Sequence, residues 1–305
     1  MHLGLTPWDM QDLSALNLTE QASYAESLGY NSFWLPEAHF GDAVVPDPLM
    51  LLAAVAAGTN TIQLATTSYL LPLRNPLLAA EQVAVLDRLS NGRVLLGVGR
   101  GYSTETLAAF DIAPNTKRRL FEENLKIMID AWAGGPLSSL PGDMGPVTLS
   151  PLPVQRPRPP IWVAAFGPKA LEQAGRLGLP YFASPLETLK KLKTNFEIHQ
   201  RALTGAGHRA DAVRPIMRTI YVSDNRAERE ALRIRLAATL PAGLRSTAGD
   251  VADWALIGPS RYVADKIDEY RETLNITHLV VSRLRIEGIN MARLRASVTA
   301  IAELM

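Results

Sequence analysis

The chain contains no cysteine among its 305 residues. Disulfide bonds, thiolate nucleophiles and cysteine-ligated metals are therefore chemically excluded. An excess of charge of one sign is also missing, since 31 Lys and Arg balance 30 Asp and Glu. No broad field attracts nucleic acid or an anionic membrane. We therefore predict a small-molecule substrate as the partner, with no nucleic acid and no metal site.

Long apolar segments are absent as well. The first residues, MHLGLTPWDM, show no basic start followed by an apolar run, and no stretch of about 18 uncharged apolar residues occurs. We expect neither a secretory signal nor a membrane span, and the missing cysteine agrees with a cytoplasmic protein. Hydrophobic residues make up 47% of the chain and charged residues 20%, which is ordinary for a globular protein with a sizeable core.

Short β-rich runs alternate along the chain with longer stretches of helical periodicity. Helices are predicted at residues 18–28, 77–89 and 118–132. Parallel strands joined by crossover helices explain this alternation, so we predict an α/β fold, a (β/α)8 TIM barrel with insertions, forming one domain over residues 1–305. The predicted strands are residues 2–6, 32–35, 62–71, 93–98, 161–166, 181–183, 215–222 and 278–282.

Two segments depart from the alternation. Residues 133–160 are rich in Gly and Pro and are predicted to form an irregular excursion, with or without a short hairpin. Residues 241–257 show weak periodicity and are predicted to form a mobile loop at the active site. Substrate specificity is expected to reside in the loops at residues 136–160 and 241–257, and the sequence does not identify the substrate.

Glu37 and His39 follow the second predicted strand, in the run FWLPEAHFGD. The strand ends of an α/β barrel form its working face, and a histidine with an ordinary pKa of about 6.5 can hold or deliver a proton there. The alternative is a rim histidine that only hydrogen-bonds a carbonyl group. Sequence position leaves both interpretations open.

Two further strand ends carry candidate cofactor residues. Thr67 and Ser68, in LATTSYLLPLRNP, leave room for a flat ring, although strand propensity explains them equally well. In RVLLGVGRGYS, the alternating glycines would let main-chain N–H groups approach an anion, and Arg100 between Gly99 and Gly101 can clamp a phosphate. Glycine alternation is also common in tight turns.

Two helix starts are also candidates for phosphate binding. Arg118 and Arg119, in NTKRRLF, lie in the first turn of a predicted helix, where cations are disfavoured by roughly 0.3 to 1 kcal/mol unless an anion binds there. A solvated face is the alternative. Gly167 and Pro168 join a predicted strand to a helix, and the free N–H groups of a helix start can hold a phosphate, although every βα unit needs such a junction.

Together these segments resemble the bacterial luciferase-like monooxygenase family of flavin-dependent oxidoreductases. The most specific match is the block LATTSYLLPLRNPLLAAEQVAVLDRLSNGRVLLGVGRGY at residues 64–102. Weaker similarity extends over nearly the whole chain, through WLPEAHF, RRLFEE, IWVAAFGPKALEQAGRLGLP and GPSRYVADKIDEY.

The resemblance implies a (β/α)8 barrel that binds reduced FMN, or in one branch a deazaflavin, near the carboxyl ends of the strands. Thr67 and Ser68 match the pair that in the family often forms a non-prolyl cis peptide beneath the flavin ring, and we predict that bond here. A homodimer is also implied. The residues that resemble the family's cofactor-binding positions are Thr67, Ser68, Gly99, Arg100, Gly101, Tyr102, Arg118 and Gly167.

Three positions depart from the family's pattern. The usual histidine directly after the acidic residue is Ala38, with His39 one position later, and on a strand end such a shift can reverse the direction of a side chain. The hydroxyl residues that often hold phosphate after the fifth strand are replaced by residues 167–170, GPKA. Gly99 stands where true luciferases carry a cysteine, so we expect no light emission.

The resemblance therefore predicts an enzyme, a flavin-dependent monooxygenase acting on paired donors with O2. In this scheme a separate flavin reductase, bound transiently, supplies reduced FMN, while His39, oriented by Glu37, handles a proton. One alternative is a deazaflavin-dependent hydride-transfer oxidoreductase, and Arg100 favours FMN over it. The other is a catalytically silent flavin-binding partner subunit.

Overall fold

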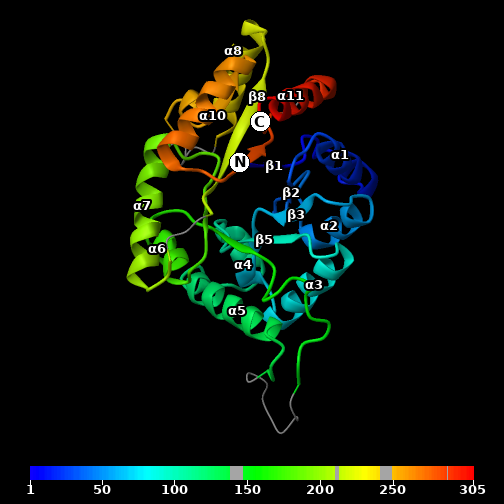
Figure 1. The fold of residues 1–305 in the computed structure, drawn as a ribbon, viewed down its shortest axis with the longest axis vertical. Helices are drawn as coiled ribbons and strands as arrows, with labels where there is room; N and C mark the ends of the chain where they lie inside the picture. Colours follow the sequence, from blue (N-terminus) through cyan, green and yellow to red (C-terminus); the bar gives the residue numbers. More distant parts are fainter. Residues whose placement is uncertain (138–146, 210–212, 241–248, 287) are drawn as a thin grey trace. The chain divides into compact units, whose positions relative to one another are not determined.

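The computed structural model describes residues 1–137, 147–209, 213–240, 249–286 and 288–305 (Figure 1). The chain divides into two compact units. Unit 1 comprises residues 1–10, 21–33 and 163–305, and unit 2 comprises residues 11–20 and 34–162. The organisation of residues 1–305 as one domain stays a prediction.

The strands of unit 2 run parallel to one another. β3 pairs with β5 through Leu64 and Val94, and β4 pairs with β5 through Tyr69 and Val98. The predicted strand 62–71 is therefore two strands, and the break falls at residues 67–68. The strands of this unit are the end of β2 (Ser32–Leu35), β3 (Gln63–Thr66), β4 (Tyr69–Leu70) and β5 (Val94–Gly99).

The helices of unit 2 begin and end at local signals. The Asn75 side chain accepts the N–H groups of Leu77 and Leu78 and so caps α3, with Pro76 at the first helical position. α5 lies beside α3 (Figure 1), where the Trp132 indole N–H donates to Ala80 O at 3.0 Å. The helices are α2 (Pro48–Ala57), the 3-10 turn η1 (Leu71–Leu73), α3 (Pro76–Leu89), α4 (Thr104–Ala109) and α5 (Lys117–Trp132).

Unit 1 contains a second parallel set of strands. β1 lies between β2 and β10, β10 pairs with β8, β8 pairs with β9, and β6 pairs with β7. The predicted α/β fold of the (β/α)8 TIM-barrel class is confirmed. The strands are β1 (His2–Leu5), the start of β2, the end of β6 (Ile161–Ala164), β7 (Tyr181–Phe182), β8 (Pro215–Val222), β9 (Ala255–Gly258) and β10 (His278–Ser282).

The helices of unit 1 pack closely where small residues permit it. α6 and α7 lie side by side (Figure 1), and a Cβ atom added to Gly175 would lie 2.6 Å from His199 O, so this position requires glycine. The helices are α1 (Ala15–Ser27, of which residues 21–27 belong to this unit), α6 (Pro168–Arg176), α7 (Leu189–Gly205), α8 (Arg226–Thr239), η2 (Val251–Asp253), α10 (Ser260–Leu274) and α11 (Met291–Glu303).

The prediction of a mobile loop at residues 241–257 is wrong from residue 251 onward. η2 and β9 occupy residues 251–258, and Trp254 is 1% exposed in a cluster with Leu232 and Leu236 of α8. The burial of Trp254 and the pairing of β9 with β8 hold this segment in place. The sequence pattern does not indicate these two contacts, because a four-residue strand is too short to show a period. Residues 241–248 lie outside the described residues.

Residues 133–160 form the irregular excursion that their composition predicts, as far as they are described. Residues 147–160 contain neither helix nor strand, and Leu137 N–H donates to Val147 O at 2.8 Å. Residues 138–146, where a hairpin turn would fall, lie outside the described residues.

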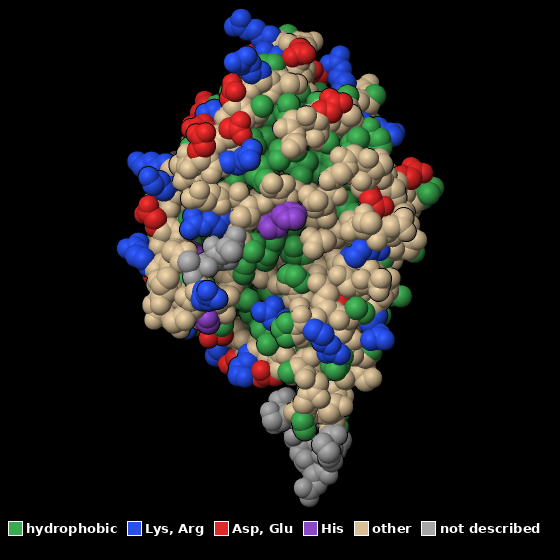
Figure 2. Space-filling view, viewed as in Figure 1, with side chains coloured by type: hydrophobic (Ala, Val, Ile, Leu, Met, Phe, Trp, Pro, Cys, Tyr) green, Lys and Arg blue, Asp and Glu red, His purple; other side chains and the backbone are tan. Residues whose placement is uncertain are grey.

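Charge and hydropathy on the surface agree with the composition. On the face drawn in Figure 2, Lys and Arg side chains lie among Asp and Glu side chains instead of forming a field of one sign. Within the described ranges, no helix combines the length and the apolar character that crossing a bilayer requires.

Candidate active site

The carboxyl ends of β2, β3 and β5 lead into loops that carry most of the predicted site residues. These loops belong to unit 2, so the contacts between their side chains lie within one compact unit. Of the predicted residues, Gly167 alone belongs to unit 1. The predicted residues that belong to unit 2 are Glu37, His39, Thr67, Ser68, Gly99, Arg100, Gly101, Tyr102 and Arg118.

Glu37 forms the centre of a buried polar cluster. Its Oε1 atom lies 2.9 Å from His39 Nε2 and 2.7 Å from Arg74 Nη2, and its Oε2 atom accepts the Leu70 N–H at 3.0 Å. The exposed fractions of the side chains are 0% for Glu37, 10% for His39 and 18% for Arg74. With a carboxylate at Nε2, a neutral His39 carries its proton on Nε2 and presents Nδ1 as a proton acceptor.

Arg74 is held in place from two further sides. Its guanidinium group lies 4.1 Å from the centre of the Tyr69 ring, in a cation–π contact. The Asn124 side chain of α5 donates to the carbonyl oxygens of Leu71 at 2.9 Å and of Arg74 at 3.1 Å, which fixes the turn that carries Arg74. Sequence reasoning missed Arg74, although it directly precedes the helix signal Asn75-Pro76, because its partner Glu37 is remote in the chain.

The residues after β3 and within β5 lie in close contact. Thr67 and Ser68 are joined by a cis peptide bond, which confirms the prediction from resemblance. A Cβ atom added to Gly97 would overlap the carbonyl oxygen of Thr66, and one added to Gly99 would overlap Ser68 Oγ. The contact with backbone makes glycine necessary at position 97. The role of Gly99 at the cofactor stays a prediction.

Three cations lie near one another at the end of β5 and the start of α5. Burial and then the positive charge of Arg118 lower the pKa of Arg100 to about 10. Burial and then the charges of Arg100 and Arg118 lower the pKa of Lys117, whose Nζ donates to Gly101 O at 3.1 Å. The backbone of Gly101 has φ +72°, which favours glycine. We call Arg100, Lys117 and Arg118 the cation cluster.

The cation cluster suits a polyanionic group. Like charges brought together disfavour their own ionised forms, and a phosphate bound among them would offset this cost. Lys117 was not predicted, although it opens the run KRR. Arg119 points away from the cluster to an exposed ion pair with Glu123 at 2.8 Å. The Tyr102 side chain is 93% exposed and faces solvent.

Two aromatic rings lie beside His39. The Phe110 ring, after α4, lies edge-on to the imidazole with ring centres 4.9 Å apart, and the Phe40 ring lies 5.9 Å from that of Phe110. Both phenylalanine side chains reach solvent, with exposed fractions of 67% for Phe40 and 38% for Phe110. Sequence reasoning missed Phe110, because nothing in its local pattern indicates a contact with the loop after β2.

Gly167 lies in unit 1, at the start of α6. Its φ of +78° favours glycine, and Pro168 follows at the first helical position, as predicted. No side chain caps this helix start. Its phosphate-binding role stays a prediction.

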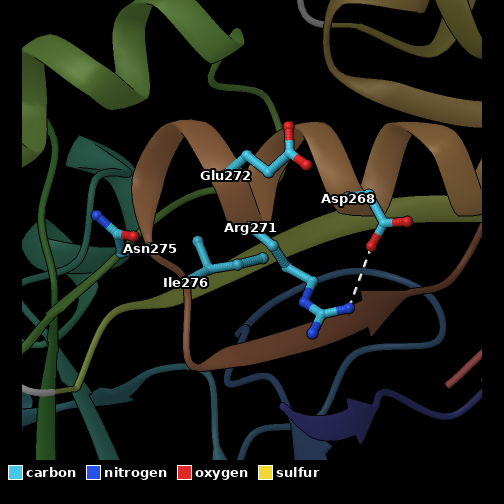
Figure 3. Close-up of a pocket in the computed structure, with 5 residues that line it drawn as sticks. All are labelled: Asp268, Arg271, Glu272, Asn275 and Ile276. Atoms are coloured by element: carbon cyan, nitrogen blue, oxygen red, sulfur yellow. Dashed lines mark hydrogen bonds and ion pairs between the residues drawn. The ribbon is translucent and has the colours of Figure 1, made fainter.

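A surface pocket in unit 1 does not share the chemistry of unit 2. It lies at the end of α10, before the start of β10 (Figure 3), whereas active sites of α/β barrels lie at the carboxyl ends of strands. Its Asp268 is already paired with Arg271 at 3.1 Å. The residues drawn are Asp268, Arg271, Glu272, Asn275 and Ile276.

Comparison with known proteins identifies one family. The profile of the luciferase-like monooxygenases matches residues 5–275. An uncharacterised protein of Sinorhizobium fredii is 32% identical over 227 residues, which cover 70% of this chain and 62% of that protein. The oxygenase component of the flavin-dependent trigonelline monooxygenase of Acinetobacter baylyi is 28% identical over 224 residues, covering 68% of this chain and 59% of that protein. The chain spans about half to two thirds of the length of the first curated relatives it matches.

Solved structures share the fold at lower identity. The oxygenating constituent of 3,6-diketocamphane monooxygenase from Pseudomonas putida, in complex with FMN, superposes with a TM-score of 0.81 at 21% identity, covering 99% of this chain and 97% of that one. The coenzyme F420 dependent tetrahydromethanopterin reductase of Methanopyrus kandleri superposes with a TM-score of 0.77 at 18% identity, covering 100% of this chain and 97% of that one.

Proposed function

This chain belongs to the luciferase-like monooxygenase family, a family of flavin- or F420-dependent oxidoreductases, and on that premise we propose that it is the oxygenase component of a two-component monooxygenase. It would act on paired donors, using reduced FMN and O2 on a small organic substrate. The observation that carries the proposal is the presence, within one compact unit, of the Glu37–His39 pair after β2 and of the cation cluster at the end of β5 and the start of α5.

The cation cluster would hold the phosphate of the flavin. Arg100 offers a planar fork of N–H donors, and Lys117 and Arg118 add two positive charges. Thr67 and Ser68, with small side chains at the end of β3, would lie beneath the ring. Gly167, at its helix start in unit 1, stays a further phosphate-binding candidate.

Bound reduced flavin would supply the electrons that activate O2. The chain's own part is to orient the cofactor, to exclude water and to move a proton. His39 would accept or return that proton at Nδ1, because Glu37 and Arg74 hold the imidazole by Nε2 in one orientation. We therefore assign His39 as the proton-handling residue, and Glu37 and Arg74 as positioning residues.

FMN is favoured over a deazaflavin by Arg100. The FMN-bound 3,6-diketocamphane enzyme and the relative named as an oxygenase component support the two-component reading, whereas the F420-dependent structures keep hydride transfer as the alternative. A silent flavin-binding subunit is disfavoured by the ordered Glu37–His39 contact, which a purely binding role does not require.

Anaerobic titration with reduced FMN, reduced F420 and reduced riboflavin tests the cofactor assignment. Lys117→Met should weaken FMN binding about tenfold, since a charge-assisted hydrogen bond contributes about 1.5–3 kcal/mol and solvent screens part of it. Riboflavin, which lacks the phosphate, should bind the variant and the native chain equally. Arg119→Met is the matched control, because Arg119 lies on the same helix but pairs with Glu123.

The outcomes separate the alternatives. Saturable binding of F420 but not FMN would support hydride transfer. Absence of saturable binding of either cofactor to the native chain would refute the family-based proposal. If FMN binds, oxygen consumption measured with a flavin reductase and a panel of aldehydes, ketones, alkanes and sulfonates distinguishes an oxygenase from a silent subunit.

A homodimer is also proposed. The outer faces of α2 and α3 expose apolar side chains that no monomer needs at its surface, and a second copy of the chain would cover them. The exposed residues are Met50, Leu78, Val85 and Leu89.

A further inference from the structure

The two phenylalanine rings beside His39 form a surface of their own, which we call the aromatic wall. Phe40 lies in the loop after β2, and Phe110 directly follows α4. The ring centres lie 4.9 Å apart for His39 and Phe110, 6.0 Å for His39 and Phe40, and 5.9 Å for the two phenylalanines. All three residues belong to unit 2, so these contacts lie within one body.

Phe40 is unfavourable for folding in two respects. Its φ of +58° places a bulky side chain in the left-handed region, where the Cβ atom crowds the backbone. Its side chain is 67% exposed, so the ring gains little from removal of apolar surface from water. A strained, exposed aromatic residue beside a proton-handling histidine points to a contact with a ligand rather than with the chain.

The chemistry of the surroundings limits what that ligand can be. The aromatic wall itself carries no charge, and Glu37, the anion in contact with His39, is already paired with Arg74 at 2.7 Å. A charged group placed against the rings would lose hydration without gaining a partner. A neutral ring would gain offset or edge-to-face contacts with both phenylalanines.

We propose that the aromatic wall is the substrate subsite and that it selects uncharged ring compounds with one polar group that hydrogen-bonds to His39 Nδ1. The inference rests on the proposed function, whose substrate class it names. Rings in van der Waals contact are separated by about 3.5 Å, so a ligand ring between Phe40 and Phe110 would need about 7 Å. Their separation of 5.9 Å places the ligand against the exposed outer faces of the rings.

The loop itself offers a matched pair of variants. Phe40→Gly removes the ring and relieves the positive φ. Ala43→Gly relieves a similar φ of +51° at an exposed position of the same loop and removes no ring. Both changes relieve a positive φ in the same loop, so a difference between them reports the loss of the ring. Phe110→Leu keeps an apolar side chain and removes the other ring.

The probes are benzyl alcohol and benzoate, which share a ring and differ in charge. Each probe is titrated against the full chain, and its binding is measured by ligand-observed NMR. The titrations are carried out under anaerobic conditions, with and without reduced FMN. The native chain should bind benzyl alcohol at least about tenfold more tightly than benzoate, and Phe40→Gly and Phe110→Leu should weaken benzyl alcohol binding about five- to tenfold. Ala43→Gly should stay within about twofold of the native Kd.

Two results would overturn the inference. One is equal or tighter binding of benzoate, and the other is an unchanged Kd for benzyl alcohol in Phe40→Gly. Binding of FMN, measured on the same samples, should be equal in all four proteins. Failure of FMN binding in the native chain would count against the proposed function, whereas failure of the alcohol titrations with FMN binding intact would count against the aromatic wall alone.

Discussion

Replacing Glu37 with glutamine removes one negative charge from the buried cluster with His39 and Arg74 and keeps the size of the side chain. The amide can still accept the Leu70 N–H that Oε2 accepts in the native chain. It cannot neutralise the Arg74 guanidinium group 2.7 Å away. The variant therefore tests whether this ion pair holds the imidazole in place.

The expected loss of stability follows from burial. Removing one partner of a buried ion pair costs about 3–5 kcal/mol, because the remaining charge is left without compensation. Glu37 has no exposed surface, but 18% of the Arg74 side chain reaches solvent, so water can hydrate part of the guanidinium group. We therefore expect the free energy of unfolding to fall by about 2–3 kcal/mol.

Urea unfolding and steady-state kinetics measure the two consequences. Turnover should fall about ten- to a hundredfold, less than the roughly 10²–10⁴-fold that a positioned acid–base group contributes, because Glu37 only positions His39. Glu123→Gln is the matched control, since it breaks an ion pair with Arg119 at 2.8 Å whose side chains are 48% and 62% exposed. That variant should lose less than about 1 kcal/mol and keep full turnover.

A double variant checks the cause. Arg74→Met combined with Glu37→Gln removes both charges, and it should recover most of the stability that Glu37→Gln loses, because neutral side chains leave no buried charge unpaired. It should not recover turnover. If Glu37→Gln loses no more stability than Glu123→Gln, or if the double variant is no more stable than the single one, the assigned role of the ion pair is wrong.

Three further changes probe packing, protonation and assembly. Gly97→Ala should destabilise the fold by about 2 kcal/mol or more in urea unfolding, because its Cβ would overlap the backbone oxygen of Thr66, and wild-type stability would contradict this. Burial and then the neighbouring His2 lower the pKa of His278 from 6.5 to about 4, so the unfolded chain takes up the proton first as the pH falls. The free energy of unfolding should be constant above about pH 6.5 and fall by about 1–2 kcal/mol between pH 6.5 and 4 after allowance for solvent screening, and His278→Asn should lack that part of the decline. Leu89→Glu should convert a dimer to a monomer in analytical ultracentrifugation, and an unchanged sedimentation coefficient would exclude the α3 face from the interface.

Local signals in the sequence account for much of the fold. The strands at residues 32–35, 215–222 and 278–282 begin and end where predicted, because each is a short run rich in apolar and β-branched or aromatic residues. α3, predicted at residues 77–89, begins one residue earlier, at Pro76, and its cap Asn75 bonds to residues only two and three positions away. β9 was missed because four apolar residues carry no measurable period, and it is ordered by pairing with β8.

The sequence by itself determined the alternation of strands and helices, the family, and which strand ends carry polar residues, since all of these depend on neighbours along the chain. Tertiary structure alone decided that Arg74 pairs with Glu37, that Lys117 joins Arg100 and Arg118, and that Phe110 covers His39. The physical reason is range: strand and cap signals act over a few residues, whereas ion pairs, shared charge and ring contacts join side chains that only the folded loops bring within a few ångströms.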